Sequence, residues 1–197
     1  MITMHQLERA FATARNDLAS VGLLADGLYL DHIECVRTPL PAGAFKFTGW
    51  VYDGGVTPIH AWVGWEPEVI YIPINAPVRV RTPGQTLTDV IRHEFAHAWY
   101  WLDDPYVDGV WFRRAFGARY QDTRQLAGDE HDADQYVSPY AMTNAKEDFA
   151  ETFMTYLRCR RSLARFKHRE GVYGKLIAVD DAVRRAAANR LRRGLPR

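Results

Sequence analysis

TLTDVIRHEFAHAWYWL, residues 86–102, is the stretch with the most regular pattern in this sequence. Its apolar residues recur at steps of three and four, the spacing of one face of an α-helix. These residues are Leu87, Val90, Ile91, Ala98, Trp99 and Leu102. Thr86 can cap the start of the helix, with Asp89 at the third helical position as an imperfect capping box. Pro105 limits its other end, because the residue before a proline avoids the helical conformation.

The same helix carries His93-Glu94-Phe95-Ala96-His97, which fits the pattern H-E-x-x-H. Residues four apart on a helix share a face, with Cβ atoms about 5–6 Å apart. His93 and His97 can therefore converge on one zinc ion, whose nitrogen ligands lie at about 2.0–2.1 Å. Zinc lowers the pKa of a bound water toward about 7, and Glu94 is placed to take the proton of that water. The motif predicts His93 and His97 as metal ligands and Glu94 as a catalytic base.

A zinc site of this kind needs a third protein ligand, and the sequence offers several candidates. Asp103 lies six residues after His97, but the motif with that spacing needs a glycine at the position of Tyr100. His131 lies in a strongly acidic loop. The remaining candidates lie on a second predicted helix and are Glu147, Asp148 and Glu151. Glu147 and Glu151 share a face, so one can bind the metal while the other orients a ligand histidine, and spacing alone does not distinguish them.

Working outward from the motif, strand patterns precede most of the helical ones. Residues 4–20 have helical spacing, and Gly22 is a plausible stop. Short strands are expected at 28–36, 45–52, 57–63 and 69–74, and further helices at about 111–116, 144–161 and 176–191. This order predicts an α+β fold with a small, mostly antiparallel sheet. We expect a single domain, residues 1–197, with an N-terminal lobe to about residue 104 and a C-terminal lobe from about 105.

The residues around the second predicted helix resemble a known family. Tyr136-Val137-Ser138-Pro139-Tyr140-Ala141-Met142-Thr143-Asn144 leads into Glu147-Asp148-Phe149-Ala150-Glu151-Thr152-Phe153. Together with H-E-F-A-H, these residues resemble the putative zinc-binding metallopeptidases related to the catalytic domain of anthrax lethal factor, which are gluzincins. The specific match covers residues 86–160, and residues 111–117 are a weaker shared feature.

The resemblance implies a zincin-like metalloprotease fold, with an active-site helix and a helical C-terminal lobe. It also implies zinc as the cofactor, one ion per chain. Matched by position, Glu147 is the third metal ligand and Tyr140 is the catalytic tyrosine that donates to the oxyanion. Glu151 matches the second glutamate of the family's E-x-F-A-E pattern, and we infer that it orients a ligand histidine.

The composition is that of an ordinary globular protein, with 47% hydrophobic and 25% charged residues and a net charge of +1. No apolar run approaches the roughly 18 residues of a membrane span, and the N-terminal residues lack the apolar segment of a signal peptide. We therefore expect a cytoplasmic protein with no membrane partner. Cys35 and Cys159 are too few for a disulfide framework or a thiolate zinc site.

These observations predict a zinc-dependent peptidase that acts on a protein or peptide substrate, with a zinc-bound water and a glutamate general base. The alternative is a zinc-binding interaction or anti-defence module with little peptidase activity. Such a module could contact nucleic acid through the basic residues from Arg158 onward, although a solvated helical face is the simpler interpretation of that tail. The intact Glu94 favours the peptidase, because a purely structural zinc site needs no base.

Overall fold

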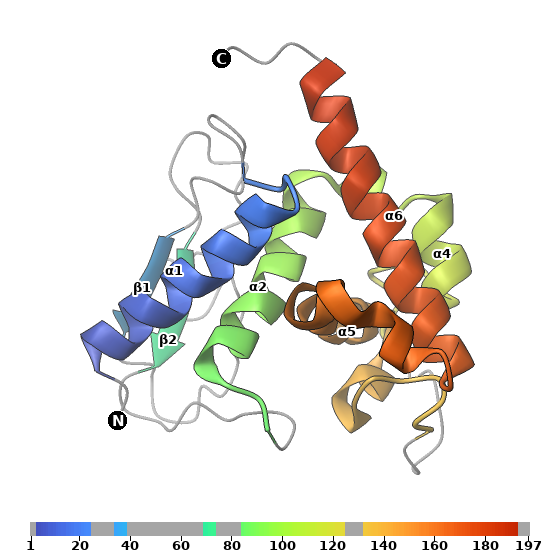
Figure 1. The fold of residues 1–197 in the computed structure, drawn as a ribbon, viewed down its shortest axis with the longest axis horizontal. Helices are drawn as coiled ribbons and strands as arrows, with labels where there is room; N and C mark the ends of the chain where they lie inside the picture. Colours follow the sequence, from blue (N-terminus) through green and yellow to red (C-terminus); the bar gives the residue numbers. More distant parts are fainter. Residues whose placement is uncertain (1–2, 25–33, 39–68, 74–83, 125–131, 193–197) are drawn as a thin grey trace.

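The computed structural model describes residues 3–24, 34–38, 69–73, 84–124 and 132–192, and these residues are mainly helical (Figure 1). The helices in this part of the chain are α1 (Met4–Ser20), α2 (Leu87–Leu102), α3 (Asp104–Val107), α4 (Val110–Phe116), α5 (Ala145–Cys159) and α6 (Glu170–Arg192). Short 3-10 helices, η2 (Pro139–Thr143) and η3 (Arg160–Phe166), flank α5. The strands are β1 (Glu34–Thr38) and β2 (Val69–Pro73).

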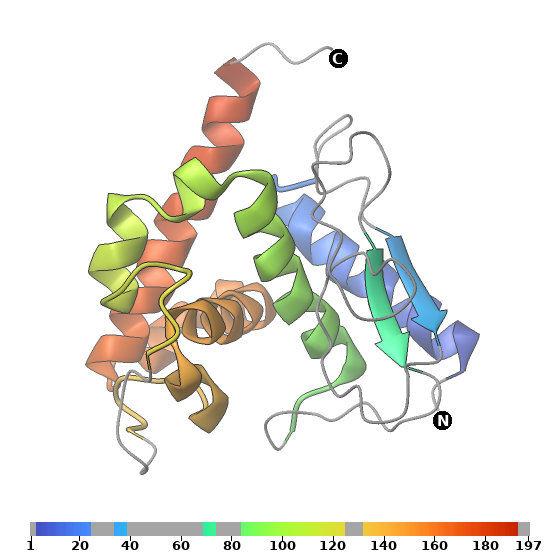
Figure 2. The same ribbon diagram turned by 180° about the vertical axis from the view of Figure 1, so that it is seen from behind.

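Helix α2 lies at the centre of this arrangement. Figures 1 and 2 show α1 and the strand pair on one side of α2, and α4, α5 and α6 on the other. Both α1 and α5 pack directly against α2, and α6 packs on α5 and α4. The H-E-x-x-H helix is therefore enclosed by elements from both ends of the chain.

The predicted fold class is wrong for the part of the chain that the structure describes. The sequence predicts an α+β fold with a mostly antiparallel sheet, whereas the described residues are mainly helical and β1 pairs with β2 in parallel. The register places Glu34 opposite Val69 and Thr38 opposite Pro73. An alternating apolar pattern identifies an extended segment, but it does not give the direction in which that segment pairs. The strands predicted at 45–52 and 57–63 lie outside the described residues.

The helix predictions are confirmed more closely. The helix predicted over residues 4–20 is α1, and the active-site helix begins directly after Thr86, as predicted. The predicted second helix is α5, with Asn144 as its N-cap. The last helix, α6, begins at Glu170, earlier than the predicted residue 176, and η3 was not expected at all.

Side-chain caps explain where α2 begins. The Thr86 hydroxyl accepts a hydrogen bond from the backbone N of Asp89 at 3.2 Å, and the Asp89 carboxylate accepts one from the backbone N of Thr86 at 3.0 Å. Aspartate thus completes a capping box in which glutamate or glutamine is usual. Asp89 also accepts from Arg92 at 2.6 Å, and Arg92 is paired with Asp17 of α1. These bonds fix the N-terminal turn of α2 against α1.

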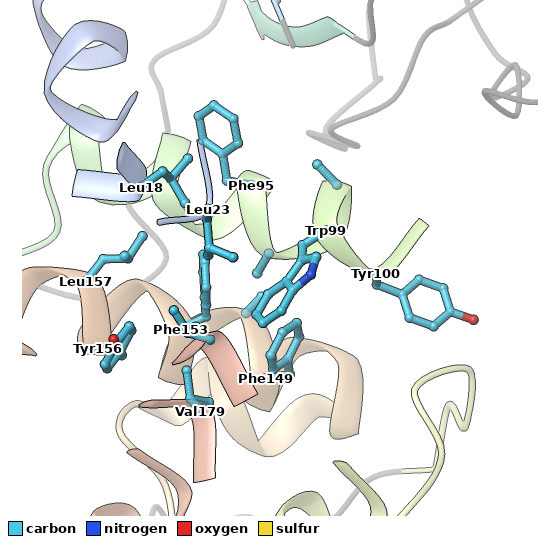
Figure 3. Close-up of a cluster of buried hydrophobic side chains, with 14 of the residues drawn as sticks. Leu18, Leu23, Phe95, Trp99, Tyr100, Phe149, Phe153, Tyr156, Leu157 and Val179 are labelled. Carbon is cyan, nitrogen blue, oxygen red and sulfur yellow. The ribbon is translucent and has the colours of Figure 1, made fainter. Parts of the chain in front are cut away.

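A core of large apolar side chains holds α2 against α5 (Figure 3). Trp99 of α2 is fully buried, and its ring centroid lies 5.6 Å from that of Phe153 and 6.1 Å from that of Phe149. Phe95, one turn earlier on α2, stacks on Phe11 of α1 at 5.9 Å. Burial of each such side chain contributes about 1.5–3 kcal/mol. The apolar face of α2 is therefore fixed on both sides, which also fixes the direction of its polar face.

Gly22 closes the end of α1 in a way that only glycine allows. Its φ is 76°, in the left-handed region that L side chains avoid. A Cβ at this position would also lie 2.9 Å from the Cβ of Ala187 in α6. The turn after α1 thus lies directly against the last helix.

Among the described residues, no helix has the length and apolar character needed to cross a membrane.

Candidate metal centre

Two histidines of α2 and one glutamate of α5 form a compact cluster. The Nε2 atoms of His93 and His97 lie 3.1 Å apart, and their rings meet edge to face. Glu147 Oε2 lies 3.2 Å from Nε2 of His93 and 3.6 Å from Nε2 of His97. All three residues are buried, and they are the group within the described chain whose ligand atoms converge closely enough to hold a metal ion.

The spacing of these three atoms fits a tetrahedral ion. Ligands about 2.0–2.1 Å from zinc stand about 3.3 Å from one another at tetrahedral angles. The observed separations of 3.1, 3.2 and 3.6 Å lie around that value. Glu147 Oε2 is also enclosed and makes no hydrogen bond to the described residues. A buried carboxylate oxygen is costly unless a cation or a donor satisfies it, so the donor set fits a metal ion.

The other nitrogen of each histidine is already engaged. His93 Nδ1 lies 2.8 Å from Glu151 Oε1, and His97 Nδ1 lies 2.6 Å from the hydroxyl of Tyr120. A carboxylate can only accept, so His93 carries its hydrogen on Nδ1 and donates it to Glu151. Its Nε2 then presents a lone pair to the cluster, as a metal ligand must. Glu151 thus contacts the ring nitrogen of His93 that is not the one nearest Glu147.

Glu151 is held by further donors. Ser138 Oγ donates to Oε2 of Glu151 at 2.7 Å, and Gln85 Nε2 lies 3.0 and 2.9 Å from its two oxygens. Burial raises the pKa of Glu151, but the hydrogen bonds from His93, Ser138 and Gln85 lower it more, and the net pKa is below its ordinary value. Glu151 is therefore an ionised carboxylate, which is the form that accepts from His93.

Glu147 is positioned by the start of α5. It occupies the third position of the helix, and its backbone N donates to Oδ1 of the N-cap Asn144 at 3.0 Å. The positive end of the helix dipole favours a carboxylate here. Burial raises the pKa of Glu147, but its close contacts and charge interactions with the two histidines lower it far below its ordinary value. The Glu147 carboxylate is thus charged.

The predicted catalytic residues border the same cluster. Glu94 follows His93 in the chain and is fully buried. Burial lowers the pKa of His97, and the nearby Glu94 is among the groups that act to raise it. Tyr140, in η2, is half-buried, and its ring centroid lies 6.0 Å from that of His93. The structure therefore brings every candidate site residue from the sequence to one place: His93, Glu94, His97, Tyr140, Glu147 and Glu151.

The rejected candidates for the third ligand lie elsewhere. Asp103 is the residue that ends α2 and does not belong to the cluster. Asp148 faces away from the cluster and pairs with Lys175 of α6 at 2.6 Å. Burial raises the pKa of Asp148 to about 6, even though the charge and hydrogen bond of Lys175 act to lower it. His131 lies outside the described residues.

Sequence reasoning missed three partners of the site: Tyr120, Ser138 and Gln85. A ligand histidine usually donates its second ring N–H to another group, so the motif itself implies a partner for His97. Nothing in the sequence near His97 says which residue that is, because Tyr120 lies 23 positions further along the chain.

Comparison with protein families gives a match over much of the chain. The sequence model of a family described as "Putative zinc-binding metallo-peptidase" matches residues 75–191. Comparison with curated proteins and with solved structures gave no match. The matched residues make up more than half of the 197-residue chain and include every residue of the cluster and each of its partners. The predicted resemblance to these peptidases is confirmed, while the narrower relation to lethal factor stays a prediction. The chain belongs to the putative zinc-binding metallo-peptidase family.

Proposed function

We propose that this chain is a zinc-dependent peptidase in which His93, His97 and Glu147 hold one zinc ion. The observation that carries the proposal is the convergence of two imidazole nitrogens and one buried carboxylate oxygen at separations of 3.1, 3.2 and 3.6 Å. Three protein ligands leave a fourth position open, as in catalytic rather than structural zinc sites. The family description, which names zinc and peptidase activity, supports the same function.

The bound ion supplies Lewis acidity, which polarises a scissile carbonyl and lowers the pKa of a water molecule toward about 7. Glu94 is the general base that removes a proton from the attacking water and passes it to the leaving amine. Its burial within the site keeps bulk water from competing for that proton. Tyr140 donates a hydrogen bond to the carbonyl oxygen as that oxygen gains charge. Glu151 holds the His93 ring in place throughout.

The basic C-terminal residues give little support to the alternative of a nucleic-acid-associated module. Arg184 and Arg185 of α6 pair with Asp180 and Asp181 at 2.9 and 2.6 Å, one turn earlier on the same helix. Arg160 pairs with Asp17 of α1 at 3.0 Å. These partners offset the charge of those three arginines, which a phosphate would otherwise contact.

The test measures zinc per chain and peptide hydrolysis in the same preparations. Wild type should contain near one zinc per chain, and Glu147→Ala should lose most of it. Glu170→Ala, at the exposed start of α6, is the matched control and should retain the metal. Glu94→Gln should keep the zinc while hydrolysis of a peptide library falls by about 10²–10⁴-fold. Wild type without zinc, or Glu147→Ala with a full complement, would contradict the ligand assignment. Full hydrolysis by Glu94→Gln would contradict the role of the base.

A further inference from the structure

We infer that Tyr120 is a positioning residue for His97, which fixes the ring of this ligand so that its Nε2 faces the metal; this rests on the zinc site of the proposed function. Tyr120 is distinct from Tyr140, because its hydroxyl lies at Nδ1, on the side of the imidazole opposite the cluster. It cannot reach a substrate from there. Its effect on the site passes through His97.

The contact between the two residues is short and enclosed. The Tyr120 hydroxyl lies 2.6 Å from His97 Nδ1, and only 1% of Tyr120 is exposed. A tyrosine hydroxyl can accept a hydrogen bond as well as donate one. When Nε2 serves as a metal ligand, the ring hydrogen is on Nδ1 and the tyrosine oxygen accepts it. The oxygen of Tyr120 is therefore placed to accept from the form of His97 that binds metal through Nε2.

Tyr120 is itself held from several sides. Its ring stacks on Tyr100 of α2, with centroids 3.5 Å apart and planes at 4°. Phe112 of α4 and Phe149 of α5 meet it at 5.8 and 6.2 Å. Its backbone N donates to Oδ1 of Asp108 at 3.0 Å. The aromatic contacts and the backbone hydrogen bond hold the Tyr120 hydroxyl in one position. A group that orients a metal ligand must itself be fixed in this way.

The chain direction at Tyr120 is set by the end of α4. Gly117 ends that helix with a φ of 73°, the left-handed conformation common after a helix C-terminus. The turn brings Tyr120 against α2, where its ring stacks on Tyr100. The proposed site thus draws on a further segment, 117–120, in addition to α2, η2 and α5.

The two histidines differ in the charge of their partners. His93 donates to Glu151, an anion, whereas His97 meets a neutral phenol, since tyrosine ordinarily ionises only near about pH 10. A charged acceptor strengthens a hydrogen bond roughly twofold over a neutral one. Loss of the Tyr120 hydroxyl should therefore weaken zinc binding measurably, but less than loss of the Glu151 carboxylate.

The experiment compares the zinc dissociation constants of wild type, Tyr120→Phe and Tyr100→Phe by competition with a chromophoric chelator. Tyr120→Phe keeps the stacked ring and removes only the oxygen at His97. Its dissociation constant should rise about 10- to 100-fold, the usual effect of losing such a partner. Tyr100→Phe removes a hydroxyl from the same stacked pair, one that accepts from Gln121 at 3.3 Å, and should stay near wild type.

Thermal unfolding of the metal-free proteins and the ¹⁵N shifts of the histidine rings complete the test. A purely structural role would lower the melting temperature of metal-free Tyr120→Phe and leave its zinc affinity unchanged, which would overturn the inference. So would ring shifts in zinc-loaded wild type that place the His97 hydrogen on Nε2. If wild type binds no zinc, the proposed function fails and takes this inference with it. If wild type binds zinc and Tyr120→Phe binds it equally well, this inference alone fails.

Discussion

At the scale of single residues, Tyr140 is the side chain whose proposed role most needs to be separated from metal binding. Tyr140 lies in η2, and its ring centroid is 6.0 Å from that of His93 in α2. A donor aimed at developing charge acts mainly on the chemical step, so Tyr140→Phe should lower kcat by about 10²–10³-fold and leave zinc content intact. Steady-state hydrolysis measured beside metal analysis checks this. Tyr136→Phe, from the same loop, is the control, because the Tyr136 ring packs under Lys175. A Tyr140→Phe enzyme that turns over at the wild-type rate would remove Tyr140 from the mechanism.

The site residues that could be predicted from the sequence are those whose residue types and spacing match a known metal-binding pattern. His93, Glu94 and His97 lie within four positions of one another on one helix, so the pattern alone predicts a metal site and a base. Glu147 and Glu151 needed the family resemblance, because either of two glutamates on one helix face can be the ligand. The structure places Glu147 at the Nε2 atoms and Glu151 at Nδ1 of His93. Which glutamate meets which nitrogen depends on how α5 is positioned along α2. This tertiary arrangement cannot be inferred from the spacing of residues within one helix.

At the scale of elements, the first turn of α5 contains both the cap that stabilises the helix and the proposed metal ligand Glu147. Asn144 caps the backbone N of Glu147 itself at 3.0 Å. Asn144→Ala should cost about 1 kcal/mol in the free energy of unfolding and also weaken zinc binding, because the ligand stands in the turn that frays. Urea unfolding and zinc titration measure the two effects. Asn144→Ser keeps a capping oxygen and should restore both. An alanine variant as tight for zinc as wild type would show that the cap is not needed to place Glu147.

Helices were predictable because the interactions that define them join residues a few positions apart. Strand pairing was not, because it joins segments that are far apart in the sequence. The start of α2 is fixed by bonds between Thr86 and Asp89, three residues apart, and its face by spacing within a few turns. The partner of β2, by contrast, is β1, more than 30 positions earlier in the chain. Alternation marked both segments as extended, but it carries no information on whether they pair in parallel or antiparallel.

At the scale of the whole molecule, the proposed ion joins α2 to α5, the two helices that share the Trp99–Phe153 core. Binding to the folded chain alone stabilises it by about 2.7 kcal/mol at a zinc concentration 100 times the dissociation constant. For a chain of this size, chelation should then lower Tm by roughly 5–10 °C. Differential scanning calorimetry with and without chelator measures the shift. Added zinc should reverse it, and added magnesium, which prefers octahedral oxygen ligands, should not. An unchanged Tm after verified removal of the metal would mean that the ion does not join the two helices.

The overall arrangement was the least predictable feature. The sequence indicated ordinary globular composition and the helix that carries H-E-x-x-H. It did not indicate that the turn at Gly22 after α1, near one end of the chain, would lie against Ala187 of α6, near the other. Gly22 allows this close contact because it has no Cβ, and the need for a glycine here becomes clear only from the positions of both segments in the structure. The division into two lobes within one domain stays a prediction.

The separation of α2 from α5 along the chain has a consequence for biosynthesis. The ribosome completes α2 at residue 102 before it has added residues 103–144, which takes on the order of seconds. During that interval the nascent chain carries the whole H-E-x-x-H motif but neither Glu147 nor the carboxylate that orients His93. Under the proposed mechanism, hydrolysis begins only after α5 has emerged and folded onto α2. Under the same proposal, a chain that stops before residue 147 lacks the third metal ligand and has no complete site.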